Sequence, residues 1–279
     1  MREFRFMLIA SAVALLCLGL TTPAALAGPE PPGADGGVST MIIGGRDATE
    51  PYSFMVSLQS EAEGGNHFCG GSLIAPEWVV TAFHCVRNVA DPGDLELRIG
   101  SLRKKEGGTV RGAERVVLHP EGDAVHFDIA LVKLDEPVSN APVPVDARQP
   151  AGSPVRMLGW GCTEPNPATW GCKPGTTPEV LQVLDSGVRD SGACVNVKGP
   201  IEPESELCTG NPDSKAGACF GDSGGPLLRS TAGGWRLLGA FSRVEILSQD
   251  HTADCSTGMG IYTDVTVHRE WMESVMSGG

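Results

Sequence analysis

The stretch Gly221-Asp222-Ser223-Gly224-Gly225-Pro226 is the most informative local pattern in the sequence. Glycines on both sides of Ser223 let its backbone come close to a substrate carbonyl, and the N–H groups of Gly221 and Ser223 can both point at a developing oxyanion. A serine hydroxyl is a weak nucleophile, so it needs a base within hydrogen-bond reach and a carboxylate that orients this base. The pattern therefore directs attention to one histidine and one carboxylate elsewhere in the chain.

Two other stretches supply candidates for the base and the carboxylate. His84 lies in Thr81-Ala82-Phe83-His84-Cys85, beside a cysteine whose disulfide would hold the backbone in place. Asp128 has apolar neighbours in Phe127-Asp128-Ile129-Ala130-Leu131, and a buried carboxylate needs a partner such as a histidine N–H. The three candidates follow one another along the chain in the order His, Asp, Ser.

The composition limits the class of protein. The chain has 279 residues, 41% of them hydrophobic and 20% charged, which suits one large domain or two small ones. With 21 Lys and Arg against 34 Asp and Glu the formal charge is −13, so nucleic acid is a poor partner. The 37 glycines and 21 prolines have no Gly-X-Y period and favour a β-rich fold with many turns.

The first 41 residues have the pattern of processing segments. Residues 1–27 combine a basic start, an apolar run over 6–20 and the exit Ala25-Leu26-Ala27, which is typical of a secretory signal peptide. The run is shorter than the roughly 20 residues of a membrane span, so we expect a secreted, extracellular protein with no membrane attachment after cleavage. Residues 28–41 are rich in Gly and Pro, carry only acidic charges and are predicted to form a propeptide.

The folded part is predicted to span residues 42–279 and to be all-β. Short apolar runs alternate with turn clusters, at 52–58, 72–74, 78–80, 95–99, 130–134, 155–160, 226–228, 235–241 and 260–265. The proline-rich stretch 141–154 divides this part into two similar halves, about 42–150 and 151–265. Only residues 268–276 have apolar side chains at helical spacing, which predicts one short C-terminal helix.

Over about residues 42–275 the chain resembles the chymotrypsin family of trypsin-like, secreted serine endopeptidases. Besides the three stretches already quoted, the resemblance rests on Ile42-Ile43-Gly44-Gly45, Cys69-Gly70-Gly71-Ser72-Leu73-Ile74, Gly159-Trp160-Gly161 and Ile261-Tyr262. It implies two six-stranded antiparallel barrels with the catalytic triad in the cleft between them. It also implies His84 as general base and acid, Asp128 as its orienting carboxylate, Ser223 as nucleophile, and the N–H groups of Gly221 and Ser223 as oxyanion hole.

One departure from the family lies at Phe83, where the family usually has alanine. The ring could crowd a substrate subsite, or it could fill a gap beside the base.

The cysteines predict a disulfide framework. Without Cys17 of the apolar run, eight cysteines remain, and no Cys-x2-Cys pair is present, so four disulfides are favoured over zinc. Eight cysteines allow on the order of a hundred pairings, which composition does not resolve. The resemblance implies Cys69 with Cys85, Cys194 with Cys208 and Cys219 with Cys255, and this leaves Cys162 with Cys172.

The resemblance also implies a zymogen. In the family, the amino group that cleavage frees inserts beside the aspartate preceding the nucleophile, here Ile42 and Asp222. Desolvating two charges is costly, so such a pair acts as a switch rather than as a source of stability. The residue before the cut is Met41, which argues against a trypsin-like activator and favours a protease specific for apolar residues.

The resemblance assigns a specificity pocket without a charge at its floor. It places Gly217 at the floor, Ala218 beside it, Ser242 to Val244 on one wall and Gly260 on the other, with Val244 narrowing the slot. We therefore expect an uncharged, apolar residue before the scissile bond. This preference and the activator specificity expected from Met41 together lead to the hypothesis that the enzyme cleaves after its own Met41.

An acidic side chain could still reach this pocket. The connection from Glu245 to Asp254 is longer than usual in the family, and Glu245, Asp250 or Asp254 could fold back to supply a carboxylate. Arg243, where the family commonly has tryptophan, could neutralise such a group.

Two other functions fit parts of the pattern. Gly221-x-Ser223-x-Gly225 also matches the nucleophile elbow of α/β-hydrolases, and His251 and His268 lie downstream, but the residues after the serine read as a strand instead of a helix. A catalytically dead binding relative would have the same fold.

We further predict protein or peptide substrates, a monomer, and no cofactor or metal. His126 and Asp128 are two residues apart with no third ligand nearby, so His126 is expected to face solvent. The histidines at 67, 119, 251 and 268 are expected on the surface or in loops.

Overall fold

The computed structural model describes Met1 and residues 42–60, 65–166, 168–169, 171–197, 201–247 and 255–278. The described residues from Ile42 onward belong to one compact unit, Val38–Gly279. Apart from Met1, the signal peptide predicted at 1–27 and the propeptide predicted at 28–41 lie outside the described residues. Both segments therefore stay predictions.

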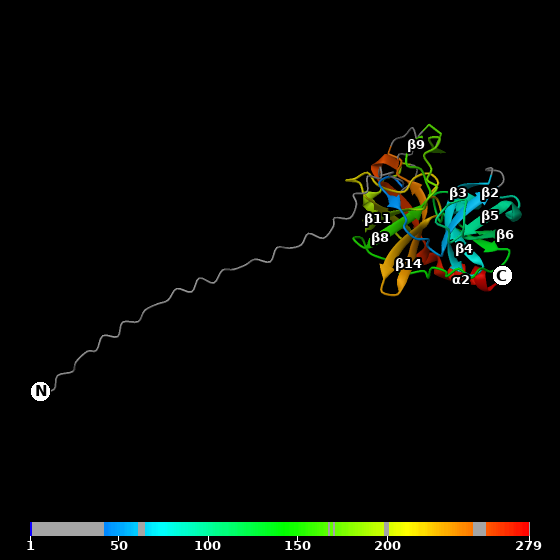
Figure 1. The fold of residues 1–279 in the computed structure, drawn as a ribbon, viewed down its shortest axis with the longest axis horizontal. Coiled ribbons are helices and arrows are strands. Elements are labelled where there is room, and N and C mark those ends of the chain that lie inside the picture. The colour runs from blue at the N-terminus through cyan, green and yellow to red at the C-terminus, as the bar shows by residue number, and fades with distance from the viewer. Residues whose placement is uncertain are drawn as a thin grey trace, which may run out of the picture. The chain divides into compact units, whose positions relative to one another are not determined.

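Six strands of the first half close into an antiparallel barrel in the order β2-β3-β4-β7-β6-β5 (Figure 1). In β5, Leu95, Leu97 and Ile99 are buried and alternate with Glu96 and Arg98, as expected for a strand with one face on the core. The strands are β2 (Met55–Ser60), β3 (Asn66–Ala75), β4 (Trp78–Thr81), β5 (Leu95–Ile99), β6 (Thr109–Leu118) and β7 (Ala130–Leu134).

The second half forms a second barrel. The strand order β11-β12-β15-β14-β13-β8 closes because β8 also pairs with β11, and β1 (Arg46–Asp47) pairs with the first two residues of β11. A separate ribbon pairs β9 (Pro165–Asn166) with β10 (Gly171–Cys172). The barrel strands are β8 (Pro154–Gly159), β11 (Gln182–Arg189), β12 (Glu206–Gly210), β13 (Pro226–Thr231), β14 (Gly234–Val244) and β15 (Met259–Asp264). The predicted all-β fold of two six-stranded antiparallel barrels is confirmed.

The proline-rich stretch 141–154 connects the two barrels, as predicted. The Val143 N–H donates to Leu73 O of the first barrel at 2.9 Å, and Pro144 O accepts from Leu237 N of the second barrel at 2.9 Å. The connection is therefore tied to both halves.

The helices are short, in agreement with the glycine and proline content. The predicted C-terminal helix is observed as α2 (Arg269–Ser277), and its Met272 packs in a hydrophobic cluster that includes residues of both barrels. Within the described ranges, no helix has the length and apolar character needed to cross a membrane. The other helices are α1 (Phe83–Val86) and the 3₁₀ segments η2 (Pro92–Asp94), η3 (Ser191–Ala193), η4 (Cys255–Thr257) and η5 (Val265–His268).

Six strands have no counterpart among the predicted runs, namely the barrel strands β6, β11 and β12 and the two-residue strands β1, β9 and β10. In β6 only Ala113 of ten residues is buried, so the strand carries too many polar and charged positions to be recognised as an apolar run. β13 begins three residues after Ser223, so a strand follows the serine and the α/β-hydrolase alternative is wrong.

All four implied disulfides are present. Cys69–Cys85 joins β3 to α1, and Cys219–Cys255 joins the segment before Ser223 to η4. Cys194–Cys208 and Cys162–Cys172 complete the set. The first two bridges act directly on the segments that carry His84 and Ser223.

Candidate active site

Ser223 lies in the connection between β12 and β13, in a backbone conformation that requires glycine on both sides. Gly221 and Gly224 have φ of +93° and +75°, which other residues rarely adopt. A Cβ on Gly224 would lie 2.2 Å from Thr81 Oγ1. Ser223 O accepts a hydrogen bond from Gly70 N at 2.7 Å, so the serine of the second barrel is attached to β3 of the first.

His84 is held by Asp128 through two hydrogen bonds. Its backbone N–H donates to Asp128 Oδ1 at 2.9 Å, and its ring Nδ1 lies 2.8 Å from Asp128 Oδ2. Because a carboxylate only accepts, Nδ1 carries the hydrogen and Nε2 is left as the basic atom of the neutral ring. The neighbouring disulfide of Cys85 anchors α1, so both the position and the tautomer of the imidazole are set.

Asp128 is fully buried, and its polar atoms are satisfied by both barrels. The Ser242 hydroxyl donates to Asp128 Oδ2 at 2.6 Å, and Thr263 Oγ1 donates to the Asp128 backbone carbonyl at 3.0 Å. Ser242 was predicted as a pocket wall. It lines the cavity and also contacts the carboxylate, a role that the sequence did not reveal.

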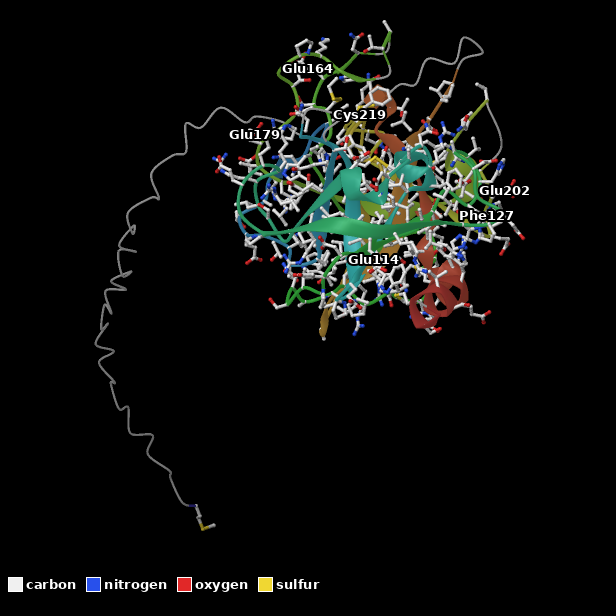
Figure 2. The ribbon with its side chains drawn as sticks, turned by 90° about the vertical axis from the view of Figure 1, so that its right-hand side faces the viewer. Glu114, Phe127, Glu164, Glu179, Glu202 and Cys219 are labelled. Carbon is white, nitrogen blue, oxygen red and sulfur yellow. A yellow bond between two sulfur atoms is a disulfide. The ribbon has the colours of Figure 1, made fainter. Side chains whose placement is uncertain are left out.

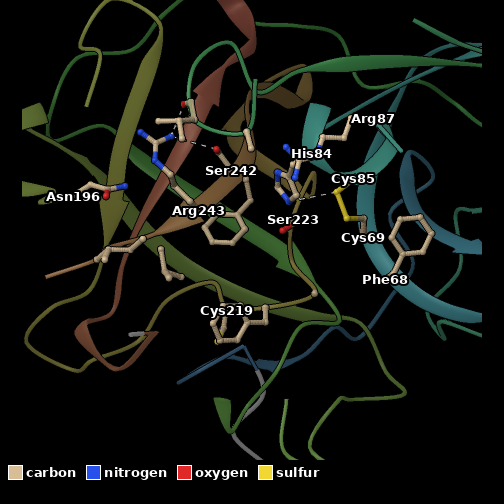
Figure 3. A pocket seen from close by; sticks show the side chains of 17 residues that line it. Phe68, Cys69, His84, Cys85, Arg87, Asn196, Cys219, Ser223, Ser242 and Arg243 are labelled. Carbon is tan, nitrogen blue, oxygen red and sulfur yellow. Dashed lines mark hydrogen bonds between the residues drawn. A yellow bond between two sulfur atoms is a disulfide. The ribbon is translucent and has the colours of Figure 1, made fainter. Parts of the chain in front are cut away.

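His84 and Ser223 line one cavity of about 630 Å³, and Figure 3 shows the Ser223 hydroxyl beside the His84 ring. No hydrogen bond joins the two side chains among the residues that the structure describes, and His84 Nε2 lies 3.8 Å from Cys85 Sγ. In enzymes without substrate such catalytic hydrogen bonds are often long, and they shorten when substrate binds. The arrangement brings all three predicted triad residues to one place.

The backbone around Gly221 offers two free donors. In the described part of the chain, neither the Gly221 N–H nor the Ser223 N–H donates to a protein acceptor. Two unpaired N–H groups beside a nucleophile can bind the oxygen of a tetrahedral intermediate.

His67 supports the backbone at Gly221. Its Nε2 donates to Gly221 O at 2.9 Å, and its Nδ1 accepts from the Ser57 hydroxyl at 2.9 Å. Burial lowers the pKa of His67 to about 4, so the ring is neutral near pH 7. His67 lies in strand β3, and its ring is held between Ser57 and Gly221. The expectation that it lies on the surface or in a loop is wrong.

Two further histidines lie at the start of α2. His268 is buried, which lowers its pKa to about 4, and His119 stacks on Phe127 with ring centroids 5.2 Å apart. The expectation of a surface position is wrong for His268, while His251 lies outside the described residues.

Asp222 is a buried carboxylate without a cation among the described residues. It is 2% exposed and accepts from Gly161 N and Cys219 N, each at 2.8 Å. Burial raises its pKa to about 7 in spite of these two donors. A Cβ on Gly159 would lie 1.9 Å from its carboxylate, which explains why the sequence has glycine there.

The predicted activation residue Ile42 is packed near the same segment. Its side chain is fully buried in one hydrophobic cluster with Ala218 and Cys219. Ile43 forms a bridge with Gly217, whose N–H donates to Ile43 O at 3.0 Å. Residues 42 and 43 are thus attached to the segment that leads to Ser223, whereas Met41 lies outside the described residues.

The residues that line the cavity differ from those predicted for the specificity pocket. Val244 lines it as expected, but Gly217, Ala218 and Gly260 do not. Instead the Phe241 ring lines the cavity, and a Cβ on Gly260 would lie 3.0 Å from its Cε2. Phe241 was missed because only the tertiary structure turns this residue of an apolar strand toward the cleft.

The cleft and the outer surface differ in charge. Arg87 and Arg243 line the cavity, and no Asp or Glu among the described residues does. Exposed carboxylates lie on the outer surface instead, as Figure 2 shows for Glu114, Glu164, Glu179 and Glu202.

The acidic group considered for the pocket is not observed in the described residues. Glu245 accepts from Val195 N at 2.7 Å and does not line the cavity. Asp250 and Asp254 lie outside the described residues. Arg243 forms an ion pair with Glu206 of β12 and not with a group in the pocket.

Phe83 and His126 both lie away from the positions in which they could have affected the active site. Phe83 does not line the cavity, and its ring packs against Gly122, where a Cβ would lie 2.9 Å from Cδ2, in agreement with a gap-filling role. His126 lies 3.4 Å from the Asp123 carboxylate rather than beside that of Asp128. Cys69, Cys85 and His84 are close together, but both sulfurs belong to a disulfide and offer no thiolate.

Two six-stranded barrels with serine, histidine and aspartate around one cleft define a serine endopeptidase, a hydrolase. A sequence model described as Trypsin matches residues 42–272, and the chain belongs to this family. It is 30% identical over 236 residues to a protein named Trypsin from Saccharopolyspora erythraea, with 82% of this chain and 97% of the relative covered. It is 31% identical over 254 residues to alpha-fibrinogenase albofibrase from Trimeresurus albolabris, with 86% and 89% covered. Its substrates are proteins or peptides.

Proposed function

We propose that the chain hydrolyses peptide bonds through an acyl-enzyme formed on Ser223. His84 Nε2 takes the proton from the Ser223 hydroxyl as its oxygen attacks the scissile carbonyl. The N–H groups of Gly221 and Ser223 bind the resulting oxyanion, and His84 then gives the proton to the leaving amine. Water then attacks the acyl carbonyl while His84 takes one of its protons, and His84 returns this proton to Ser223 Oγ as the ester bond breaks, which releases the carboxylic acid product and restores the serine. Asp128 keeps Nδ1 protonated and stabilises the imidazolium.

One observation carries this proposal. Asp128 holds His84 by two hydrogen bonds while Ser223, attached from the opposite barrel, lines the same cavity. Pairing of base and carboxylate around a serine with two free N–H neighbours is the arrangement that nucleophilic acyl transfer requires.

The proposal includes export and activation. Residues 1–27 act as a signal peptide and residues 28–41 as a propeptide, and the mature monomer is secreted. Four disulfides favour an oxidising compartment. Cleavage before Ile42 frees an amine that pairs with Asp222, whose buried carboxylate otherwise has two N–H donors among the residues that the structure describes.

The test of the mechanism is covalent labelling. A serine-directed peptide phosphonate is expected to react stoichiometrically with the mature enzyme, and peptide mapping by mass spectrometry should locate the adduct on Ser223. The Ser223→Ala variant is the matched control and should bind none. A folded, processed enzyme that incorporates no phosphonate would support the dead binding relative and contradict the proposal.

For specificity, we expect cleavage after small or medium apolar residues. Val244 and Phe241 fill the slot, and two arginines without a lining carboxylate disfavour a basic residue there. Cleaving a peptide library and sequencing the products should give at least about tenfold preference for such residues over Arg and Lys. The Val244→Gly variant should admit larger side chains. Strong cleavage after Arg or Lys would contradict the pocket assignment.

A further inference from the structure

Arg243 occupies the cleft wall where the family commonly has tryptophan, and nothing in the proposed mechanism uses it. It is the second-last residue of β14, directly after Ser242, and its side chain is only 11% exposed. We propose that Arg243 is a positioning residue of the catalytic carboxylate, which directs the Ser242 hydroxyl toward Asp128 and places a positive charge behind the Asp128 and His84 pair. This inference rests on the proposed triad.

A continuous series of hydrogen bonds leads from Arg243 to the base, and Figure 3 shows its first step, from Arg243 to Ser242. Arg243 Nη1 donates to Ser242 Oγ at 3.3 Å, and Ser242 Oγ donates to Asp128 Oδ2 at 2.6 Å. The same Oδ2 atom binds His84 Nδ1 at 2.8 Å. A serine hydroxyl has one hydrogen and two lone pairs, so a guanidinium on its oxygen leaves the hydrogen for the carboxylate.

Arg243 also ties the two barrels together near Asp128. Its Nη1 donates to Val125 O at 3.0 Å, three residues before Asp128 in the first barrel. Between them, Phe127 has φ of +46°, a conformation that a phenylalanine adopts only when its surroundings hold it. Losing Arg243 would release one of the contacts that hold this turn.

The charge of Arg243 is balanced by Glu206 on β12. The guanidinium binds Glu206 Oε1 through Nη1 and Oε2 through Nη2, the latter at 3.0 Å, and the Glu206 side chain is 2% exposed. This planar two-point pair suits arginine and not lysine. Glu202 N also donates to Glu206 Oε2 at 2.7 Å. The triad is therefore exposed to the opposing fields of one cation and one anion, which largely cancel in the wild-type protein.

Other charged groups around this pair are known, and the variants below leave them unchanged. Asp128 and His84 belong to the triad, and the exposed pair of Asp123 and His126 lies on the preceding turn. The Arg148 guanidinium donates to Glu206 O at 3.4 Å, and Arg87 lies on the opposite side of the cavity. Glu245 accepts a hydrogen bond from Val195 N. Changing Arg243 therefore removes one positive charge and changing Glu206 removes one negative charge, while all other charges near the triad stay the same.

The two single variants are expected to shift the acidic limb of the pH profile in opposite directions. A cation near His84 disfavours its protonation, so Arg243→Met raises the apparent pKa of the limb, and Glu206→Gln, which leaves Arg243 unbalanced, lowers it. Coulomb's law across this series of hydrogen bonds, at an effective dielectric constant between those of water and of a dry protein interior, gives shifts of roughly half a unit to one unit. The double variant should return close to the wild-type value.

The experiment measures kcat/KM of the processed enzyme from about pH 5 to about pH 9, where the acidic limb reports the base of the free enzyme. Arg243→Lys should keep the limb near its wild-type position while kcat falls, because it keeps the charge and loses the fork. Arg156→Met is the matched control, since it breaks an ion pair with Asp185 outside the cleft and should not move the limb. If Arg243→Met does not fold, the double variant compared with Glu206→Gln alone supplies the same difference.

Limbs that shift in the same direction in both variants, or that do not move, would overturn the inference and leave Arg243 a structural residue. The activity of Ser223→Ala tests the triad independently of the pH profiles. Retained activity in Ser223→Ala would contradict the proposed function, whereas an inactive Ser223→Ala with unmoved limbs would contradict only the role of Arg243.

Discussion

Replacing Ser223 by alanine is expected to lower kcat by about 10⁶-fold, because the acyl-enzyme can no longer form and only binding and oxyanion stabilisation remain. The measurement is kcat on a peptide substrate with enzyme whose purity is checked by phosphonate titration. The cavity and the free N–H groups of Gly221 and residue 223 persist in the variant, so KM should change much less than kcat.

His84→Ala provides the companion variant. Nucleophile and base act as a unit, so His84→Ala should lower kcat about as much as Ser223→Ala does. The double variant should lower kcat little more than either single variant, whereas the two losses would multiply if the residues acted independently. Asp128→Asn should lower kcat about 10⁴-fold, because an amide N–H in place of Oδ2 donates to Nδ1 and so favours the wrong tautomer of His84. Activity of Ser223→Ala within tenfold of wild type would remove the assignment of the nucleophile.

The second large effect concerns the amino group of Ile42. A mature chain that begins at Ile42 is expected to exceed one that begins at Met41 by at least about 10²–10³-fold in kcat/KM, the typical contribution of an oxyanion-hole donor. The two proteins differ by one residue, and only the first has an amine able to pair with Asp222. Refolded chains of both lengths, with N-termini verified by mass spectrometry, give the comparison. Equal activities would contradict activation before Ile42.

Asp222 gives this prediction a pH dependence. In the uncleaved chain, burial raises the pKa of Asp222 from 3.8 to about 7. A group whose pKa is raised on folding stabilises the fold fully below its unfolded value, and this contribution is lost as the pH rises through the folded value. The free energy of unfolding should therefore fall between about pH 4 and about pH 7, by up to about 4 kcal/mol.

The amine of Ile42 should reverse much of this loss, since a nearby cation favours the ionised carboxylate. Urea unfolding of both chains across this pH range is the measurement, and Asp222→Asn in the longer chain should remove the slope. The same longer precursor carrying Ser223→Ala tests self-processing. Loss of residues 28–41 at an unchanged rate in a protease-deficient host would exclude the enzyme as its own activator.

The sequence was sufficient for features with a strong local cause. Ser223 stands between glycines whose positive φ and close contacts admit no other residue, so the pattern around it is visible along the chain. Apolar runs and the proline-rich connection at 141–154 indicated two β halves, and helical spacing indicated α2 to within one residue of each end. Family resemblance supplied the barrel closure and three of the four disulfide pairs.

The weaker predictions failed where burial does not follow from residue type. Histidine is common on surfaces, yet His67 and His268 are enclosed by neighbours that come from distant strands. The polar positions of β6 and β11 hid two barrel strands, because a barrel strand needs only its inward positions to be apolar.

By itself, the sequence determined a β-rich chain in two halves with His84, Asp128 and Ser223 as triad candidates, because these depend on local patterns. The two closed barrels and the endopeptidase activity were implied by the family resemblance. Only the tertiary structure decided what surrounds them. Ser242 reaches Asp128 across 114 positions of sequence, and His67 reaches Gly221 across 154. Such contacts arise when two barrels close and pack against each other, so the side chains that narrow the cleft and hold the triad are selected by three-dimensional packing rather than by any spacing along the chain.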